Sequence, residues 1–344
     1  MKRIAARLLE REIVSLLVTW GMPETFSRTA SHVMVETDLR GIDSHGVGMI
    51  PFYAEAAREG RLNLRPNIAV LHERQSALLI DADNGLGHPA AVMAMSKAIG
   101  KARETGVGIA GVTRSRHFGA AGYYAQMAAD AGLIGLAFTN STGPLAVPTF
   151  GREPFLGTNP IAFAAPAARN PSLVLDMATT TVAYGKITIA RRAGKPIPEG
   201  WAVDEEGKAV TDANIAAKSR RLTPLGGGRS SSGHKGYGLA LMVEVLCATM
   251  TGANKSAGET GHFVMAINPL SFGEDGAFEA GLDRLIDLVH GLARQDLDQS
   301  VLVPGDPEYA AYEERIRLGI PLGMTLLEEL RAEFVRSELP FYLG

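Results

Sequence analysis

The chain has 344 residues and a nearly balanced charge, with 34 Lys and Arg against 37 Asp and Glu and a formal net charge of −3. Hydrophobic residues make up 46 % and charged residues 21 %, as in ordinary globular proteins, which disfavours a disordered chain and argues against a nucleic-acid partner. The single cysteine, Cys247, has no intramolecular disulfide partner, so a reducing cytoplasm is the expected compartment.

No membrane segment is expected. No apolar run approaches the roughly 20 residues that span a bilayer. Glu10, Arg11 and Glu12 interrupt the first apolar stretch, which argues against a signal peptide.

The first sixty residues are predicted to be helical. Apolar residues recur at helical spacing between Leu8 and Leu17. A second helix is expected from about 24 to 40, ending before Gly41, and a third from Pro51 to Gly60.

After this helical part, short apolar runs bounded by Gly, Asn or Pro predict buried strands. Five strands are expected, at 76–81, 106–113, 132–139, 160–166 and 173–178. Helical stretches accompany them at 88–104, 119–131 and 181–193. The alternation predicts an α/β architecture.

The second half of the chain has weaker signals. Residues 194–233 are rich in Gly, Pro and charge, and we expect an excursion with few core contacts. Helices at about 235–250 and 276–295 lie on either side of an apolar run at 262–268, and 304–340 is predicted to be helical.

Two glycine patterns match the dinucleotide-binding fingerprint, but neither is expected to act as one. Residues 85–90 follow a strand and precede a helix, yet the next strand ends in Thr113-Arg114-Ser115, without an acid to accept from a ribose hydroxyl. Residues 106–111 lie inside a strand. We interpret both as turn and packing glycines.

The glycine-rich stretch 226–236 leads into an apolar helix and contains Lys235. Free backbone N–H groups, the positive end of the helix dipole and the lysine charge suit a phosphate group. A surface loop before a capped helix explains the same residues equally well. The stretch is not a Walker A loop, since Gly-Lys-Ser/Thr is absent.

Two of the eight histidines are candidates for proton transfer. His45 follows Ser44 in a glycine-containing loop between two helices, and His117 follows the predicted strand 106–113 at its C-terminal end, where ligands of open α/β folds collect. Each can instead be a loop histidine bonded to backbone. No HExxH or Cys/His cluster is present, so no metal site is expected.

The remaining titratable candidates have simpler explanations. His32, His72 and His290 are interpreted as structural or solvated. Asp176 ends a predicted strand, where it can accept from a ribose hydroxyl or, as its residue type favours, cap the helix that begins near 181. Lys186 lies in that helix and is either directed at the same region or solvated.

Seven segments, in order over nearly the whole chain, together resemble the type-2 malate/L-lactate dehydrogenase family. They are DLRGIDSHGVG (38–48), DADNGLGHPAA (81–91), SRHFGAAGYYA (115–125), GREPFLGTNPIAFAAP (151–166), LVLDMATT (173–180), GHKGYGLALMVEVL (233–246) and PGDPEYAAYEERIRLGIPL (304–322). The family includes ureidoglycolate dehydrogenase, sulfolactate dehydrogenase, 2,3-diketo-gulonate reductase and piperideine-2-carboxylate reductase.

The resemblance implies an NAD- or NADP-dependent oxidoreductase that acts on a 2-hydroxy, 2-oxo or 2-imino acid. It implies a family-specific, non-Rossmann α/β fold, with a mixed sheet flanked by helices, and a homodimer whose active sites lie near the interface. We accordingly expect a helical N-terminal part (1–73), a cofactor- and substrate-binding α/β domain (74–303) and a helical C-terminal segment (304–344) that returns to the N-terminal part.

The same resemblance suggests roles for individual residues. Ser44 and His45 match the proton-relay pair, with His45 as the acid/base, and His117 matches a second catalytic histidine. Thr158 matches a substrate contact, and Lys186, at a position that varies among relatives, is the second substrate-binding candidate. The matches to cofactor contacts are Ser141, Asp176, Met177, Ala178, His234, Lys235, Pro304, Gly305 and Asp306.

One departure concerns the substrate. Most members have an arginine four residues after the histidine, which pairs with the substrate carboxylate; here the residue is Met49. The cations that can replace it are Arg40, Arg116, Arg152 and Lys186. Interconversion of a 2-hydroxy acid and its 2-oxo acid is the expected function. The alternatives are a cyclic 2-imino acid reductase and a non-catalytic relative that still binds the cofactor.

Overall fold

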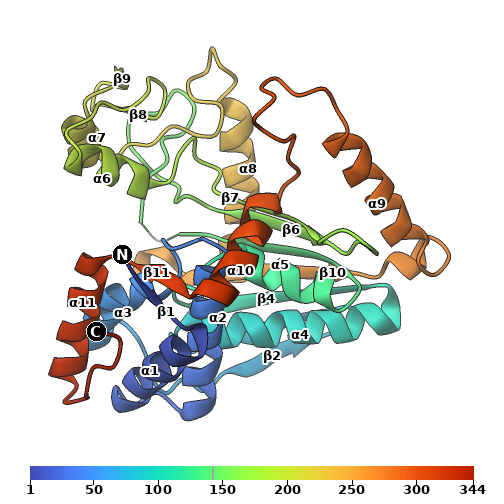
Figure 1. Ribbon diagram of the computed structural model, residues 1–344, viewed down its shortest axis with the longest axis horizontal. Helices are drawn as coiled ribbons and strands as arrows, with labels where there is room; N and C mark the ends of the chain where they lie inside the picture. The colour runs from blue at the N-terminus through green and yellow to red at the C-terminus, as the bar shows by residue number, and fades with distance from the viewer. Residues whose placement is uncertain (142) are drawn as a thin grey trace.

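A seven-stranded mixed sheet forms the centre of the protein, whose structure, a computed structural model, describes residues 1–141 and 143–344 (Figure 1). The strand order is β2-β3-β4-β10-β5-β6-β7, with β3 and β4 parallel and every other neighbouring pair antiparallel. The strands are β2 (Ala69–Glu73), β3 (Ala77–Asp81), β4 (Val107–Ser115), β5 (Ile134–Thr139), β6 (Ile161–Ala165), β7 (Leu173–Met177) and β10 (Thr260–Ile267).

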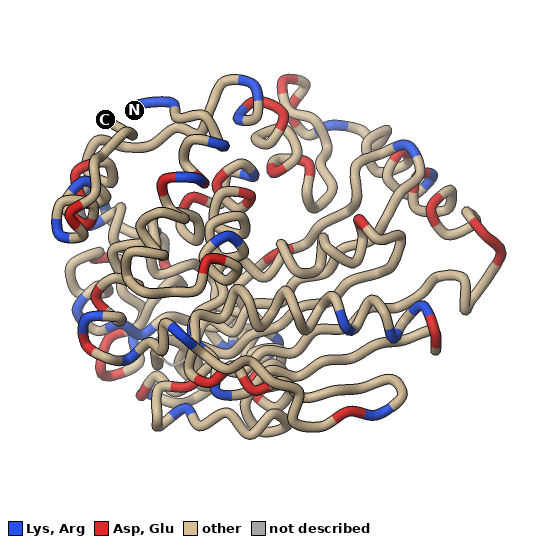
Figure 2. The backbone as a smooth tube through the Cα atoms, turned by 90° about the horizontal axis from the view of Figure 1, so that it is seen from below, with Lys and Arg blue, Asp and Glu red and all other residues tan. Residues whose placement is uncertain are grey.

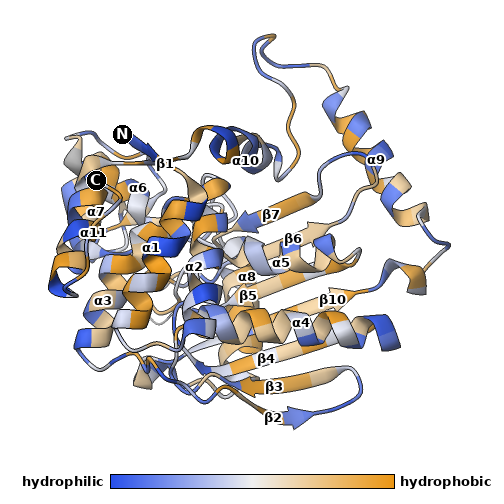
Figure 3. Ribbon diagram, turned by 60° about the horizontal axis from the view of Figure 1, so that its bottom comes forward, coloured by the Kyte–Doolittle hydropathy of each residue, from blue (hydrophilic) through white to orange (hydrophobic). Residues whose placement is uncertain are grey.

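Helices cover both faces of this sheet. On one face, α4 (Gly87–Thr105) packs on β4 and β10, and α5 (Ala121–Asp130) packs on β5 and β6. On the other face, α8 (His234–Glu244) and the π-helical turn that follows it (Val245–Thr249) contact β4, β5 and β10. Figure 3 shows that β3, β4, β5 and β10 consist largely of apolar and weakly polar residues, as expected for strands between two layers.

Small residues let α4 lie directly on the sheet. Its buried side is built from alanines, and a Cβ atom on Gly108 of β4 would overlap the carbonyl group of Ala98. Gly106 ends α4 in the left-handed conformation, with φ of +85°. The prediction that the glycines of 106–111 serve in turns and packing is therefore confirmed.

The two ends of the chain meet beside the sheet. β1 (Lys2–Ile4) pairs with β11 (Ile320–Leu322), and both chain termini lie on this side of the molecule (Figure 1). The second hydrophobic core is shared by helices from both ends. These helices are α1 (Ala6–Thr19), α2 (Glu24–Leu39), α3 (Ile50–Arg58), α10 (Asp306–Leu318) and α11 (Met324–Arg336).

Residues 184–222 form a small unit with its own core, so the expected excursion with few core contacts is wrong. The unit contains α6 (Tyr184–Arg192), β8 (Ala202–Val203), β9 (Ala209–Val210) and α7 (Ala213–Ser219). Ile187, Ala202, Ala216 and Leu222 are fully buried within it. Their wide spacing, among glycines and charges, gave no periodic signal. Beyond this unit, α9 (Ala277–His290) lies at the far side of the sheet (Figure 1).

The five predicted strands and the main helices are present within a few residues of their expected bounds. Two short strands interrupt segments that were expected to be helical. Residues 69–73 form β2 at the edge of the sheet, and residues 320–322 form β11. Neither strand has a recognisable sequence pattern. Most residues of β2 are exposed, so no apolar run marks it, and β11 has only three residues, Ile-Pro-Leu, with a proline at its centre.

Charges of both signs are distributed along the chain. Figure 2 shows short blue and red segments interspersed on the helices and connecting loops. Among the described residues, no helix combines the length and apolar character needed to cross a membrane.

Candidate active site

The loop that carries Ser44 and His45 is attached to α2 and α10. The backbone N–H of Val47 donates to Oδ2 of Asp38 over 2.9 Å, and a Cβ atom at Gly46 would overlap the Asp38 carboxyl group. Arg315 of α10 donates to the Asp38 carbonyl over 2.6 Å and forms an ion pair with Asp43. The loop is therefore held from two sides.

His45 lies half-buried in this loop and close to a second imidazole. Its Nδ1 is 2.8 Å from Oγ of Ser44, and its ring stacks on that of His117 with centroids 5.5 Å apart. Burial lowers the pKa of His45 below its ordinary value of 6.5. The imidazole is therefore a free base near neutral pH and is able to accept a proton.

His117 follows β4, and two groups contact one of its ring nitrogens. Oη of Tyr53 lies 2.7 Å from Nδ1, and the backbone N–H of Gly119 donates to the same atom over 3.3 Å. Burial, together with His45 and His88, holds the pKa of His117 well below its ordinary value. The structure thus brings together the two histidines predicted from separate segments.

Two further histidines, which sequence reasoning missed, lie behind this pair. His88 at the start of α4 is fully buried beside the ring of Tyr53, and neither of its ring nitrogens has a partner among the described residues. His262 of β10 is bonded at Nδ1 to Thr139 and at Nε2 to Ser115, at 2.7 and 2.8 Å. Burial lowers the pKa of each imidazole to about 3.

Asp176 caps a helix, although not the one expected. Its Oδ2 accepts from the backbone N–H of Gly122, at the start of α5, over 2.7 Å. The predicted partner was the helix beginning near 181, but α6 starts at Tyr184 and has no side-chain cap. The interaction joins β7 to the helix that follows the His117 loop. Burial raises the pKa of Asp176 to about 6.

Backbone hydrogen bonds gather several predicted binding stretches around Thr179, which directly follows Ala178. The Thr179 N–H donates to the Thr158 carbonyl over 2.9 Å, and its own carbonyl accepts from Leu225 over 2.8 Å. Pro304 contacts the same strand nearer its beginning, since its carbonyl accepts from Val174 of β7 over 3.0 Å. The structure thus brings Thr158 and the residue that precedes the 226–236 stretch to the end of β7, and it brings residues 304–306 to the beginning of the same strand.

Glu244 of α8 organises the loops that carry Ser141 and Thr158. Its Oε2 accepts from Asn159 over 2.8 Å and its Oε1 from Asn140 over 3.4 Å. The backbone N–H of Ser141 in turn donates to Oδ1 of Asn159 over 3.2 Å. Asn159 is fully buried, so this network sets how the two loops sit beside α8.

The N-terminus of α8 fits a cofactor phosphate. The glycine-rich stretch folds into a compact turn, with the Gly233 N–H donating to the Gly228 carbonyl over 2.8 Å. Nδ1 of His234 is buried without a partner among the described residues, and the Lys235 side chain is exposed next to it. An orphan imidazole nitrogen and a lysine at a helix N-terminus form a donor set that suits an anionic group.

Some predicted site residues have other partners, or none among the described residues. Asp306 pairs with His290 at 2.7 Å and caps its own turn through the Val303 N–H, so His290 has a structural role and is not simply solvated. Met177 and Gly305 are half-buried in β7 and before α10. Lys186 is exposed on α6, and no hydrogen bond joins its side chain to another described residue.

Two of the four cations that can pair with the substrate carboxylate, in place of the family's arginine at the position of Met49, have other partners in the structure. Arg116 donates to Asn84 over 3.0 Å and to the Gly258 carbonyl, and Arg40 lies over the ring of Tyr312. Both are therefore engaged elsewhere. Of the four candidates, the exposed Arg152 and Lys186 stay available.

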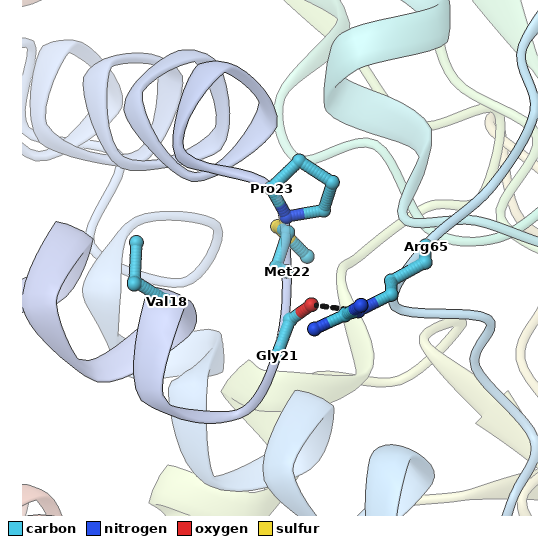
Figure 4. A pocket seen from close by; sticks show the side chains of 5 residues that line it. All are labelled: Val18, Gly21, Met22, Pro23 and Arg65. Atoms are coloured by element: carbon cyan, nitrogen blue, oxygen red, sulfur yellow. Dashed lines mark hydrogen bonds between the residues drawn. The ribbon is translucent and has the colours of Figure 1, made fainter.

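An open pocket at the turn between α1 and α2 does not belong to this arrangement (Figure 4). It is lined by Val18, Gly21, Met22, Pro23 and Arg65. Arg65, its charged lining residue, already donates to the Gly21 carbonyl over 2.8 Å. The pocket therefore offers no acid/base pair.

Comparison with known proteins identifies the family of the chain. Residues 4–331 match the family model described as malate/L-lactate dehydrogenase. The malate dehydrogenase of Pyrococcus horikoshii is 41 % identical over 328 residues, covering 92 % of this chain and 91 % of that protein. Its solved structure covers 99 % of this chain and 97 % of its own, with a TM-score of 0.89 and 36 % identity.

Two other relatives carry the cofactor in their names. The ureidoglycolate dehydrogenase (NAD(+)) of Escherichia coli O157:H7 is 38 % identical over 73 % of this chain and 69 % of its own length. The (2R)-3-sulfolactate dehydrogenase (NADP(+)) of Chromohalobacter salexigens is 33 % identical over 96 % of this chain and 98 % of its own. With a family model spanning nearly its whole length, the chain belongs to the malate/L-lactate dehydrogenase family.

Proposed function

We propose that the protein is an NAD- or NADP-dependent dehydrogenase that interconverts a small 2-hydroxy acid and its 2-oxo acid. The observation that carries this proposal is the stacked pair His45 and His117, with ring centroids 5.5 Å apart, in a region that the hydrogen bond from Gly122 to Asp176 joins to β7. Relatives named for the oxidation of malate, ureidoglycolate and sulfolactate support the substrate class.

His45 is the proposed acid/base. In oxidation its free imidazole takes the proton of the 2-hydroxyl group, and in reduction the imidazolium returns a proton to the 2-oxo oxygen. A bound nicotinamide supplies the complementary hydride acceptor or donor at C4. Ser44, 2.8 Å from Nδ1, can donate or accept and so follows His45 through both protonation states.

The proposed cofactor contacts surround the end of β7 and the start of α8. His234 and Lys235 would hold phosphate, while Asp176 and the neighbouring Met177 and Ala178 would face the rest of the cofactor. Asp176 already accepts from Gly122, and a carboxylate has further lone pairs for a ribose hydroxyl. Ser141 and the 304–306 turn complete the proposed set. For the substrate carboxylate we propose Thr158 together with Lys186.

We propose that two copies of the chain form a homodimer through α8. Leu239, Met242, Val245 and Met250 recur at helical spacing along α8 and its π-helical turn, and each is 37 to 53 % exposed. A row of exposed apolar side chains of this kind is typical of a protein interface. We propose the cytoplasm as the compartment, because the single cysteine has no intramolecular disulfide partner.

The test of the function is the variant His45→Ala, assayed with both cofactors against a panel of 2-hydroxy acids. We expect turnover to fall roughly 100-fold or more, the usual effect of losing a general base, while cofactor binding is kept. His72→Ala, on the exposed strand β2, is the matched control. Wild-type turnover in His45→Ala would overturn the acid/base role of His45. Activity with cyclic imines alone would mean that the substrates are cyclic 2-imino acids and not 2-hydroxy acids.

A further inference from the structure

The hydrogen bonds of His117 define which of its nitrogens carries the proton. A backbone N–H can only donate, so the contact from Gly119 at 3.3 Å requires a lone pair on Nδ1. Tyr53 Oη, 2.7 Å from the same atom, must then donate as well, and the two donors share the single lone pair of Nδ1. Burial raises the pKa of Tyr53, which keeps its hydroxyl proton in place.

A neutral imidazole with a lone pair on Nδ1 carries its proton on Nε2. Among the described residues no hydrogen bond engages Nε2 of His117, and the side chain is half-exposed. The proton on Nε2 is thus available to a ligand. The opposite tautomer would direct the Nδ1 proton at the Gly119 N–H.

His45 has no such restriction. Its only side-chain partner among the described residues is the Ser44 hydroxyl, which can either donate or accept. His45 can therefore exchange a proton at Nε2 while Ser44 adapts at Nδ1. His117 cannot act as a base at Nε2 unless its proton moves to the nitrogen that faces Gly119.

We infer that Tyr53 is a positioning residue that holds His117 in the Nε2–H tautomer, so that His117 donates a hydrogen bond to the substrate 2-oxygen and leaves proton transfer to His45. This inference rests on the proposed function. A donor at this oxygen stabilises the negative charge that develops on it when His45 removes the hydroxyl proton in oxidation, or when the hydride arrives in reduction. These separate roles of His117 and His45 depend on the Tyr53 hydroxyl. Its oxygen lies 2.7 Å from Nδ1 of His117, closer than the backbone nitrogen of Gly119 at 3.3 Å.

The first test uses the wild-type protein, with ¹⁵N-labelled histidine and NMR at neutral pH. The His117 signals are assigned by their loss in His117→Asn. We expect Nδ1 at the chemical shift of an unprotonated nitrogen and Nε2 at that of a protonated one. A protonated Nδ1 overturns the inference, whether or not the enzyme is active, whereas failure to oxidise any 2-hydroxy acid overturns the proposed function alone.

The second test is Tyr53→Phe, which removes the hydroxyl but keeps the ring against His88 and His117. We expect a mixture of His117 tautomers and a fall in kcat of about 3- to 10-fold, the effect of one neutral hydrogen bond, with KM for the cofactor unchanged. Tyr124→Phe is the matched control, because this fully buried tyrosine donates instead to the Phe118 carbonyl. It should leave the His117 tautomer as in the wild type.

Two results would contradict the positioning role. One is a Tyr53→Phe protein with the wild-type tautomer and wild-type kcat. The other is an equal change of tautomer in Tyr124→Phe, which would mean that any disturbance of this core shifts His117. If Tyr53→Phe does not fold, the wild-type NMR measurement still decides the tautomer.

Discussion

Gly46 lies so close to the buried carboxyl group of Asp38 that a Cβ atom at position 46 would overlap it. The neighbouring Val47 N–H donates to the same carboxyl group over 2.9 Å. The position of His45 therefore depends on a glycine and on an aspartate seven residues earlier in the chain, at the end of α2.

Replacing Gly46 with alanine should displace the His45 loop. The added methyl group must move either the backbone of the loop or the Asp38 side chain, which is held on α2 and is 1 % exposed. We expect turnover to fall about 10- to 100-fold, since small displacements of a catalytic group have effects of this size. Gly185→Ala, on α6 where nothing lies near the added Cβ, is the control and should keep full activity.

The stability of Asp38→Asn should differ from that of the wild type in a pH-dependent way. Burial raises the pKa of Asp38 from 3.8 to about 8, so the folded protein holds a proton that the unfolded chain releases above pH 4. The contribution of this group is complete below pH 3.8 and is lost as pH rises through about 8, by up to ~1.4 kcal/mol per pH unit.

An asparagine at position 38 does not titrate. The free energy of unfolding of Asp38→Asn, relative to wild type, should therefore increase between about pH 4 and pH 8 and level off above it. Urea unfolding at a series of pH values measures this difference. A difference that stays constant with pH would show that the Asp38 carboxyl group is ionised in the folded protein.

The order of the central elements could be predicted from local patterns. The strands of the sheet are short apolar runs that end at Gly, Asn or Pro, and α4 and α5 fill the spaces between them. The order of the strands in the sheet could not be predicted, because β10 lies between β4 and β5 although it begins about 145 residues after β4 and about 120 residues after β5 in the sequence. Nothing in the local sequence of 260–267 indicates that position.

The sequence pointed to the candidate residues in loops, but not to the buried residues that pack behind them. His45 and His117 stand out because they lie in glycine-containing loops after predicted elements. Tyr53 and His88 read as ordinary residues of helices, and only the packing of α3 against the start of α4 reveals them as neighbours, with ring centroids 5.8 Å apart. Asp176 was expected to cap a helix and does so, but it caps α5 and not the helix that follows it. Its partner Gly122 is distant in sequence, so no local pattern indicates the contact.

Replacing Glu244 should weaken cofactor binding more than it slows turnover. In the wild type, the side-chain amides of Asn140 and Asn159 each donate to one oxygen of the Glu244 carboxylate. In Glu244→Gln an N–H₂ group replaces one of these oxygens, so one of the two asparagines faces a donor and loses its hydrogen bond. We expect the Kd for the cofactor to rise about 5- to 10-fold, from a loss of about 1 to 1.4 kcal/mol. Glu328→Gln, exposed on α11, makes the same chemical change away from this network.

The outcome is read by titrating each purified variant with NAD and NADP. An unchanged Kd in Glu244→Gln would mean that the loops carrying Ser141 and Thr158 keep their positions without the carboxylate. A loss of activity without any change in Kd would contradict the expected split in the same way.

A charge introduced into the exposed row on α8 should dissociate the proposed dimer. Met242→Lys places an ammonium group among Leu239, Val245 and Met250, and burying an unpaired charge in an interface is strongly unfavourable. Size-exclusion chromatography with light scattering should show dimers for the wild type and monomers for Met242→Lys. Leu71→Lys on the exposed strand β2 is the control. A wild-type monomer would contradict the proposal.

The pH dependence of turnover should follow the protonation state of His45. Burial lowers its pKa below 6.5, so the free base that oxidation requires persists to lower pH than for an exposed histidine. We expect kcat/KM for hydroxy-acid oxidation to be constant above pH 6.5 and to fall below it. The rate of reduction, which requires the imidazolium, should rise as pH falls through the same pKa. His45→Ala should lose both slopes, whereas His72→Ala should keep them; an acidic limb centred above pH 6.5 would contradict a buried base.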